Sequence, residues 1–215
     1  MKIAVFDVCD TLYSVNTTFS FLDNYFADDK KYLLFRKISK LFPVKVGNYF
    51  IYKFFKKDLI RIYATTFLKN SSCKEIQSHS EKFVNEELVS KVKDTTSSMI
   101  KEYKNRDYKT VLMSGSYEFI IKEISSYFDA DYYYASKLQK VNGSYTGLYD
   151  KDILLTKYEL LQDEFTTIDE LVVVSDNKTD LALMQSADKA YAICNKEKDC
   201  SFWKEHKDII CIRDF

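Results

Sequence analysis

The chain has 215 residues, of which 46% are hydrophobic and 30% are charged. This composition is typical of a globular protein and excludes a disordered chain. Basic and acidic residues both number 32, so the net charge gives no reason to expect a nucleic-acid partner. No apolar run approaches the roughly 20 residues that a membrane-spanning helix needs.

The cysteines and the first residues bear on the cellular compartment. Five cysteines are scattered along the chain without a CxxC pair, which argues against a disulfide framework or a zinc cluster. An apolar segment begins at residue 3, with no signal peptide before it. We therefore expect a reducing compartment and a cytoplasmic protein.

Short, β-branched segments bounded by polar turns predict buried strands. Four such segments are clear and a fifth is weaker: residues 2–7, 109–114, 170–176 and 189–194, then 208–212. Helical patterns fall between them at residues 117–127, 154–164 and 179–186. This alternation predicts an α/β fold with a Rossmann-like, doubly wound parallel sheet, whose ligands bind beyond the carboxyl ends of the strands.

Residues 16–105 interrupt the alternation, because they show only helical signals and are too long for a loop. We interpret them as an all-helical cap inserted into a core of residues 1–15 and 106–215. The segment "KLQKVNGSYTGLY" has Asn142-Gly143 between alternating residues, which predicts a β-hairpin flap.

Polar residues follow three of the predicted strands. Asp7, Ser114 and Asp176 each come at a strand end, and Asp180 follows four residues after Asp176. The carboxyl ends of parallel strands meet at one edge, so we expect these side chains to converge there. Lys157 precedes or opens the helix before the strand of residues 170–176, and its ammonium group can reach the same crevice.

These residue types suit phosphoryl transfer. A carboxylate can attack phosphorus and form a covalent intermediate. Carboxylates from two strands can hold Mg²⁺, and a lysine and a hydroxyl can neutralise the phosphoryl oxygens. Plainer interpretations exist: Asp176 and Asp180 could cap a helix, Ser114 could be a turn residue, and Lys151 is a rival for Lys157.

Four segments carry a family resemblance: "FDVCDTL", "VLMSGS", "TKYELL" and "VVSDNKTDLALM". In order and spacing they resemble the four motifs of the haloacid dehalogenase (HAD) superfamily. The helical insertion after the first motif, with the hairpin before the lysine, resembles its phosphoserine-phosphatase-like branch. The resemblance covers nearly the whole chain, although the cap matches only in position and helical character.

The resemblance implies a Mg²⁺-dependent phosphomonoester hydrolase that forms an aspartyl-phosphate on Asp7. It implies these roles: catalysis by Asp7 and Lys157; phosphate binding by Thr11, Ser114, Gly115 and Lys157; and metal binding by Asp7, the backbone carbonyl of Cys9 and Asp176, with Asp180 in support. The implied substrate is a small phosphorylated molecule, with lipid or polyprenyl phosphates as candidates because some members of the branch look like lipid-phosphate phosphatases.

The chain departs from the family pattern at Cys9, where the resemblance implies an aspartate that acts as general acid and base. Losing such a group costs on the order of 10²–10⁴ in rate. Three hypotheses remain open: Asp10 takes over the role, the substrate has a good leaving group, or the protein binds phosphate without turnover. Dehalogenation ranks below these. A redox role for the thiol ranks below that of a small, partly buried filler.

Residues 30–61 carry ten basic residues and one acid, Asp58, which gives a net charge of +9 among many aromatic residues. The plain interpretation is a cap with a buried apolar face and solvated lysines. The alternative is peripheral contact with the inner face of an anionic membrane. A second functional hypothesis is thus a catalytically weak or inactive protein that binds a phosphorylated ligand or a membrane through this segment. The oligomeric state is left open.

Overall fold

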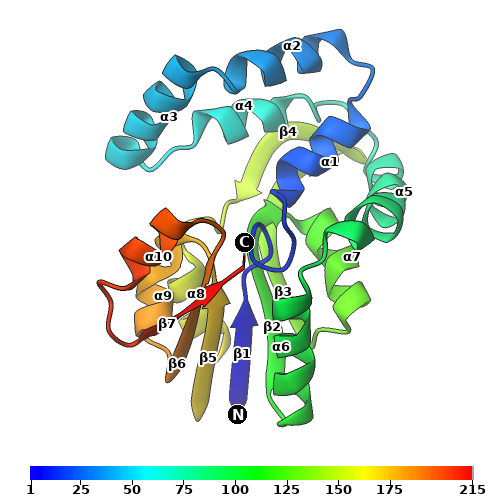
Figure 1. Ribbon diagram of the computed structural model, residues 1–215. Helices are drawn as coiled ribbons and strands as arrows, with labels where there is room; N and C mark the ends of the chain where they lie inside the picture. Colours follow the sequence, from blue (N-terminus) through cyan, green and yellow to red (C-terminus); the bar gives the residue numbers. More distant parts are fainter. Residues whose placement is uncertain (215) are drawn as a thin grey trace.

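The computed structural model describes residues 1–214, which fold around a seven-stranded sheet with the order β4-β3-β2-β1-β5-β6-β7 (Figure 1). In this spatial order, each strand from β3 across to β7 is parallel to its neighbours, and the edge strand β4 pairs antiparallel with β3. This confirms the predicted Rossmann-like α/β fold. The strands are β1 (Lys2–Phe6), β2 (Lys109–Tyr117), β3 (Tyr132–Val141), β4 (Ser144–Lys151), β5 (Glu170–Ser175), β6 (Lys189–Cys194) and β7 (Ile209–Arg213).

The five strands expected from apolar runs are confirmed, although β2 continues three residues beyond its predicted end at Ser114. The first half of β3 was missed. Its residues pair in parallel with β2, from Tyr132 opposite Val111 to Ser136 opposite Tyr117. The hairpin prediction covered only the second half of this strand, because its tyrosine-rich start lacks a β-branched apolar run.

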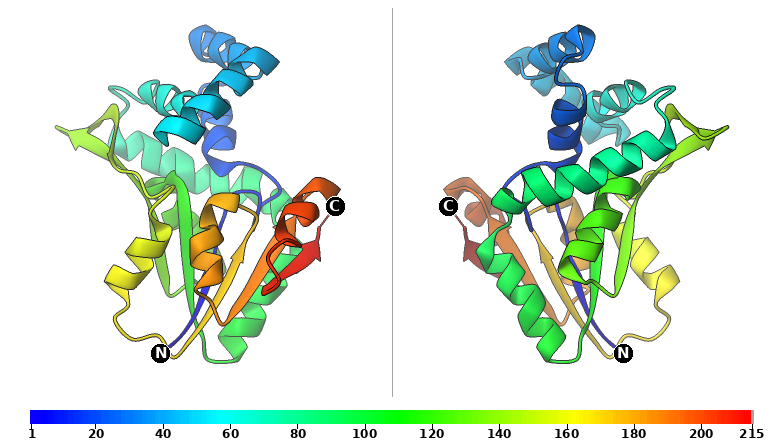
Figure 2. Two further views of the ribbon diagram at one scale, coloured as in Figure 1. Left: turned by 90° about the vertical axis from the view of Figure 1, so that its left-hand side faces the viewer. Right: turned by 90° about the vertical axis from the view of Figure 1, so that its right-hand side faces the viewer.

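Helices cover both faces of the sheet (Figure 2). Alternating side chains of β1 enter two separate cores: Ala4 and Phe6 lie in one, and Ile3 and Val5 lie in the other. Residues of α6 (Asp94–Asn105) and α7 (Glu118–Phe128) complete the first core; those of α8 (Lys157–Glu164), α9 (Leu181–Gln185) and α10 (Glu197–Trp203) complete the second. The helix predicted at residues 179–186 is α9, preceded by a 3-10 turn at Lys178–Asp180.

The segment predicted as the cap is helical throughout, and α2, α3 and α4 stand over the carboxyl ends of the strands (Figure 1). Its last helix, α6, instead packs on β1 and β2. The domain division stays a prediction, and we propose that the cap ends before Asp94. Its elements are α1 (Thr17–Tyr25), α2 (Lys30–Ser39), α3 (Phe42–Phe55), α4 (Leu59–Thr66), α5 (Cys73–Lys82), a π-turn at Phe83–Leu88 and a 3-10 turn at Val89–Lys91.

The β3–β4 hairpin joins the core to the cap. Its two-residue loop has positive φ at Asn142 (48°) and Gly143 (77°), as a type I′ turn requires. Backbone hydrogen bonds tie β4 to the loop after α4: the Asn70 N–H donates to the Tyr145 carbonyl at 2.8 Å, and the Tyr145 N–H donates to the Ser71 carbonyl at 3.0 Å. The predicted flap is therefore part of the frame that holds the cap.

Gly147 provides a test of this frame. Its φ is +80°, and an added Cβ would lie 3.1 Å from both the Cα and the carbonyl oxygen of Thr66 in α4. Gly143 has a similar φ of +77° but open space around it. We expect Gly143→Ala to lower the free energy of unfolding by about 1 kcal/mol through backbone strain alone, and Gly147→Ala by about 2–3 kcal/mol through strain and crowding. Urea unfolding measures both, and equal losses would contradict the close approach of β4 to α4.

Candidate functional site

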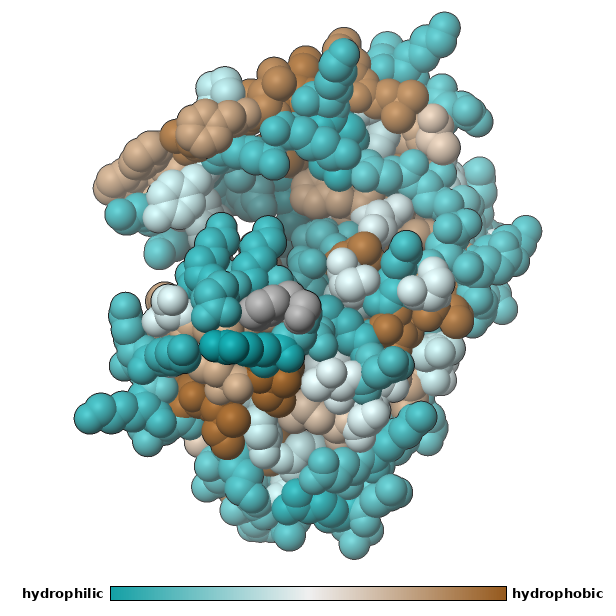
Figure 3. All heavy atoms as spheres, viewed as in Figure 1, coloured by the Kyte–Doolittle hydropathy of each residue, from teal (hydrophilic) through white to brown (hydrophobic). Residues whose placement is uncertain are grey.

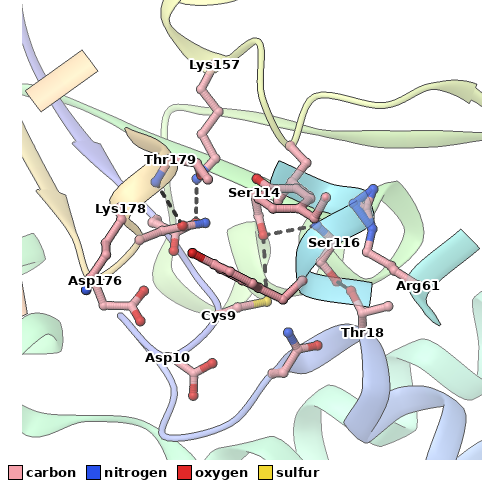
Figure 4. Close-up of a pocket in the computed structure, with 17 residues that line it drawn as sticks. Cys9, Asp10, Thr18, Arg61, Ser114, Ser116, Lys157, Asp176, Lys178 and Thr179 are labelled. Carbon is pink, nitrogen blue, oxygen red and sulfur yellow. Dashed lines mark hydrogen bonds and ion pairs between the residues drawn. The ribbon is translucent and has the colours of Figure 1, made fainter. Parts of the chain in front are cut away.

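A cavity of about 490 Å³ lies between the carboxyl ends of the strands and the cap. Figure 4 shows the side chains that line it. The sheet places Asp7 after β1, Ser114 in β2 and Asp176 after β5, so the predicted convergence is observed. The other lining residues are Cys9, Asp10, Asn16, Thr18, Tyr49, Tyr52, Arg61, Gly115, Ser116, Leu154, Lys157, Asn177, Lys178 and Thr179.

The charge cluster at the base of the cavity is centred on Lys157, the first residue of α8. Its Nζ donates to Asp7 Oδ1 and to Asp180 Oδ2, both at 2.7 Å, and all three side chains are buried. Asp180 also accepts a 2.7 Å hydrogen bond from the Ser175 hydroxyl. Burial raises the pKa of Asp7, and Lys157 only partly opposes that effect. The two carboxylates raise the pKa of Lys157 despite its burial, so the lysine stays charged.

A second group of contacts joins Asp7 to Asp176 through Thr11. The Thr11 hydroxyl oxygen lies 3.2 Å from Asp7 Oδ2 and 3.0 Å from Asp176 Oδ1, and it accepts the Asp176 N–H at 2.9 Å. Thr11 is fully buried and does not line the cavity. The side chain therefore positions two carboxylates, and the expected contact of Thr11 with phosphate stays a prediction.

The donor set fits a magnesium ion. Burial, followed by the charges of Asp7 and Asp10, raises the pKa of Asp176 to about 8. A divalent cation between Asp7 and Asp176 would offset this crowding of carboxylates. Among residues 1–214 no three His, Cys, Asp or Glu side chains form a metal-binding group. Mg²⁺ needs no such group, since it commonly takes one or two carboxylates and keeps several waters.

Cys9 directs its thiol into the cavity. The sulfur lies 3.0 Å from Thr17 Oγ1 and 3.9 Å from Ser114 Oγ. Burial and the nearby Asp7 carboxylate raise the pKa of this thiol to about 11, so it is neutral at pH 7. Cys9 is a free thiol, as are the other four cysteines. A weak, uncharged acid thus occupies the position where the resemblance implies an aspartate.

Asp10 shapes the turn after β1, which could not be predicted from its position in the sequence. Its φ is 56°, a left-handed conformation, and its carbonyl accepts a 2.9 Å hydrogen bond from the Asn195 side chain. Figure 4 shows its carboxylate on the opposite side of Cys9 from Lys157. Burial raises the pKa of Asp10, although Lys93 and Lys196 oppose this. The hypothesis that Asp10 replaces the missing acid stays a prediction, and this geometry does not favour it.

The carboxyl end of β2 is closely packed. The Ser116 N–H donates to Ser114 Oγ at 3.2 Å, and the Ser116 hydroxyl accepts from Thr18 at 2.9 Å. An added Cβ on Gly115 would lie 2.7 Å from Leu154 Cδ1 and 3.3 Å from its Cα. Glycine therefore lets the segment before Lys157 approach the carboxyl end of β2. The rival lysine, Lys151, is exposed at the end of β4 and does not line the cavity.

The sequence analysis missed the cap residues of the cavity, above all Arg61 of α4. Its Nη2 lies 2.5 Å from Asp152 Oδ1, and its Nε donates to the Tyr149 hydroxyl at 3.2 Å. Its Nη1 is a buried donor without a hydrogen-bond partner in the described chain. In the sequence Arg61 is one of ten cations in a basic run. Only its place at the C-terminal end of that run, within an amphipathic helix, distinguishes it.

The chain belongs to the haloacid dehalogenase-like hydrolase family, whose sequence model matches residues 4–185. This confirms the resemblance seen in the four motifs. Phosphoserine phosphatase of Methanocaldococcus jannaschii is 30% identical over 119 residues, which are 53% of this chain and 54% of that protein. The match thus spans about half the length of this curated relative.

Solved structures agree on the fold. A protein with unknown function from Bordetella pertussis Tohama I superposes with a TM-score of 0.76 at 14% identity, covering 97% of each chain. A phospho-aspartyl intermediate analogue of phosphoserine phosphatase superposes with a TM-score of 0.65 at 21% identity, covering 98% of this chain and 92% of that one. The predicted likeness to the phosphoserine-phosphatase-like branch is therefore confirmed.

The central ion pairs predict the effect of removing Lys157. Lys157→Ala leaves two buried carboxylates without their cation, so we expect the free energy of unfolding to fall by about 3–5 kcal/mol. Chemical unfolding in the presence of EDTA measures the loss without a bound metal. Lys101→Ala, at an exposed position of α6, is the matched control and should change it by less than about 0.5 kcal/mol. Similar values for the two variants would contradict the proposed charge cluster.

Proposed function

We propose that this chain is a Mg²⁺-dependent phosphatase that hydrolyses a small phosphorylated molecule through an aspartyl-phosphate on Asp7. The observation that carries the proposal is the setting of Asp7: its carboxylate lies in the cavity, paired with Lys157 and joined to Asp176 through Thr11. Membership of a hydrolase family and the similarity to a phosphoserine phosphatase support it.

In the first step a carboxylate oxygen of Asp7 attacks phosphorus, and the bond to the leaving oxygen breaks with its electron pair. Ser114 and the backbone N–H of Gly115 donate hydrogen bonds to the phosphoryl oxygens, and Lys157 neutralises their charge. Mg²⁺, when bound by Asp7, Asp176 and the Cys9 carbonyl, supplies further neutralisation. Water then attacks the phosphorus of the aspartyl-phosphate, which releases phosphate and restores Asp7.

Cys9 limits the rate of both steps because it is poorly suited to act as a general acid or base. A thiol with a pKa of about 11 is a weak proton donor to a leaving alkoxide and a weak base toward water. We therefore propose that the enzyme works best on substrates whose leaving group needs no proton, such as acyl phosphates or pyrophosphates. Lipid and polyprenyl phosphates remain predicted candidate substrates.

The nucleophile is tested by hydrolysis of p-nitrophenyl phosphate with Mg²⁺. We expect Asp7→Asn to lower kcat by on the order of 10³-fold or more, because the amide cannot form the covalent intermediate. EDTA should abolish the activity of the wild-type protein, and added Mg²⁺ should restore it. Asp163→Asn, at an exposed position of α8, is the control. Equal activity of Asp7→Asn and the wild-type protein would refute the mechanism.

The role of Cys9 is tested by varying the leaving group. Across aryl and alkyl phosphates, the wild-type rate should fall steeply as the leaving-group pKa rises, because no acid protonates the departing oxygen. We expect Cys9→Asp to raise alkyl phosphate hydrolysis by about 10²-fold or more, with a smaller gain for aryl phosphates. Asp10→Asn should leave the dependence unchanged. A steeper dependence in Asp10→Asn would show that Asp10 is the acid.

The second candidate function is phosphate binding without turnover, which the cysteine at position 9 favours. Calorimetric titration with inorganic phosphate and Mg²⁺ distinguishes the two. Binding in a protein that turns over neither aryl nor acyl phosphates would support the second function. Measurable turnover that depends on Asp7 supports the first.

A further inference from the structure

The outer surface of α2 and α3 is apolar to an unusual degree. Eleven of the nineteen large apolar side chains exposed within residues 1–214 lie between residues 33 and 63. No residue of α3 is buried, and Phe42, Phe54 and Phe55 are 80%, 70% and 70% exposed. Figure 3 shows the resulting apolar band along the top of the molecule. The expected buried apolar face of a cap helix is therefore only partly present in α3, where Val44 and Ile51 are half-buried.

We name this surface the α2–α3 face. In α3, Phe42, Val46, Phe50 and Phe54 are four residues apart and form one row along the helix. The remaining members come from α2 and its C-terminal end: Leu33, Leu34, Ile38 and Leu41, all exposed. Proteins that stay monomeric rarely expose so continuous an apolar surface unless it binds a partner.

The same face is strongly basic. Residues 30–57 contain eight lysines and one arginine and no acidic residue. Arg36 is ion-paired with Asp23, whereas none of the eight lysines forms an ion pair within the described chain. Lys45 and Lys53 lie beside the phenylalanine row and are exposed. Long lysine side chains in such positions can extend past an apolar layer to reach anionic groups.

We propose that the α2–α3 face docks on the surface of an anionic phospholipid bilayer, with the phenylalanines at the acyl boundary and the lysines among the headgroups. This pairing of an apolar row with flanking lysines is that of helices that lie in a membrane interface. No helix in residues 1–214 has the length and hydropathy to cross a bilayer, so the contact lies in the plane of the surface. A second copy of the chain fits worse, because a two-fold contact would bring like charges together.

The docked surface and the cavity share α3. Tyr49 and Tyr52 of this helix line the cavity, while Phe54 projects from roughly the opposite side of the helix. Docking would thus hold the cavity about one helix diameter, roughly 10 Å, from the membrane surface. The docking proposal does not rest on phosphatase activity.

The test is co-sedimentation of the full chain with vesicles of phosphatidylcholine alone or with added phosphatidylglycerol. We expect binding to the anionic vesicles that weakens as NaCl is added, and little binding to the neutral ones. The triple variant Lys37→Gln, Lys45→Gln, Lys53→Gln should bind about 100-fold more weakly, since each cation contributes roughly a factor of five. The triple variant Phe42→Ser, Phe50→Ser, Phe54→Ser should lose binding at every salt concentration.

Matched controls show whether vesicle binding depends on the lysines of the α2–α3 face rather than on the total charge of the protein or on its catalytic activity. The triple variant Lys101→Gln, Lys122→Gln, Lys198→Gln removes the same charge from exposed positions outside the cap and should bind as the wild-type protein does. Asp7→Asn should also bind normally. Circular dichroism confirms that each variant folds.

Three results would overturn the proposal: no binding to anionic vesicles, equal binding to both vesicle types, or an equal loss in the control lysine variant. Light scattering without vesicles supplies a further test. A dimer that the phenylalanine variant abolishes would assign the face to a second copy of the chain.

Discussion

The ion pairs of Lys157 with Asp7 and Asp180 are the interaction on which the site depends. One buried ammonium group lies between two buried carboxylates, and a third carboxylate, Asp176, reaches the group only through the Thr11 hydroxyl. With all three carboxylates ionised, one ammonium group would leave two negative charges uncompensated in a desolvated place, and the raised pKa of Asp176, about 8, reflects that crowding. Such an excess is costly unless a cation offsets it, and a divalent cation has the required charge. The crowding of buried carboxylates that destabilises the metal-free protein is therefore also what would favour the binding of a metal ion.

Much of this site could be predicted from the sequence, for a topological reason. Parallel strands bring their carboxyl ends to one edge, so Asp7, Ser114 and Asp176 needed only correct strand assignment to be placed together. Lys157 followed from its position at the start of a helix. The local geometry of the turn after β1 was harder to predict from the sequence. The left-handed φ of Asp10 and the buried setting of Thr11 depend on how the loop after β1 closes, and composition alone does not encode that closure.

The cap was the least predictable part. Its helices were expected, but their orientation depends on contacts between α4 and the β3–β4 hairpin, which are far apart in the sequence. This packing places Arg61 in the cavity, held by Asp152 and Tyr149 of the hairpin segment, with one guanidinium nitrogen left free. Lys53 and Lys57 precede Arg61 in the same basic run and are exposed. Periodicity does not distinguish one basic residue that lines the cavity from others that face solvent.

The α3 helix links the two proposals physically. It contributes tyrosines to the cavity and also carries exposed phenylalanines. The docking proposal would therefore place the cavity near an interface rather than only in bulk water. At the cavity, the buried Nη1 of Arg61 lacks a hydrogen-bond partner in the described chain, and the thiol of Cys9 is neutral at pH 7.

The most direct test of the central claim is to locate the phosphoryl group during turnover. The protein is mixed with a rapidly reacting aryl or acyl phosphate and Mg²⁺, quenched in acid, digested and analysed by mass spectrometry. The account predicts a phosphorylated peptide from the N-terminus with the modification on Asp7. Phosphate on another residue such as Ser114, or product formation with Asp7 never modified, would contradict it.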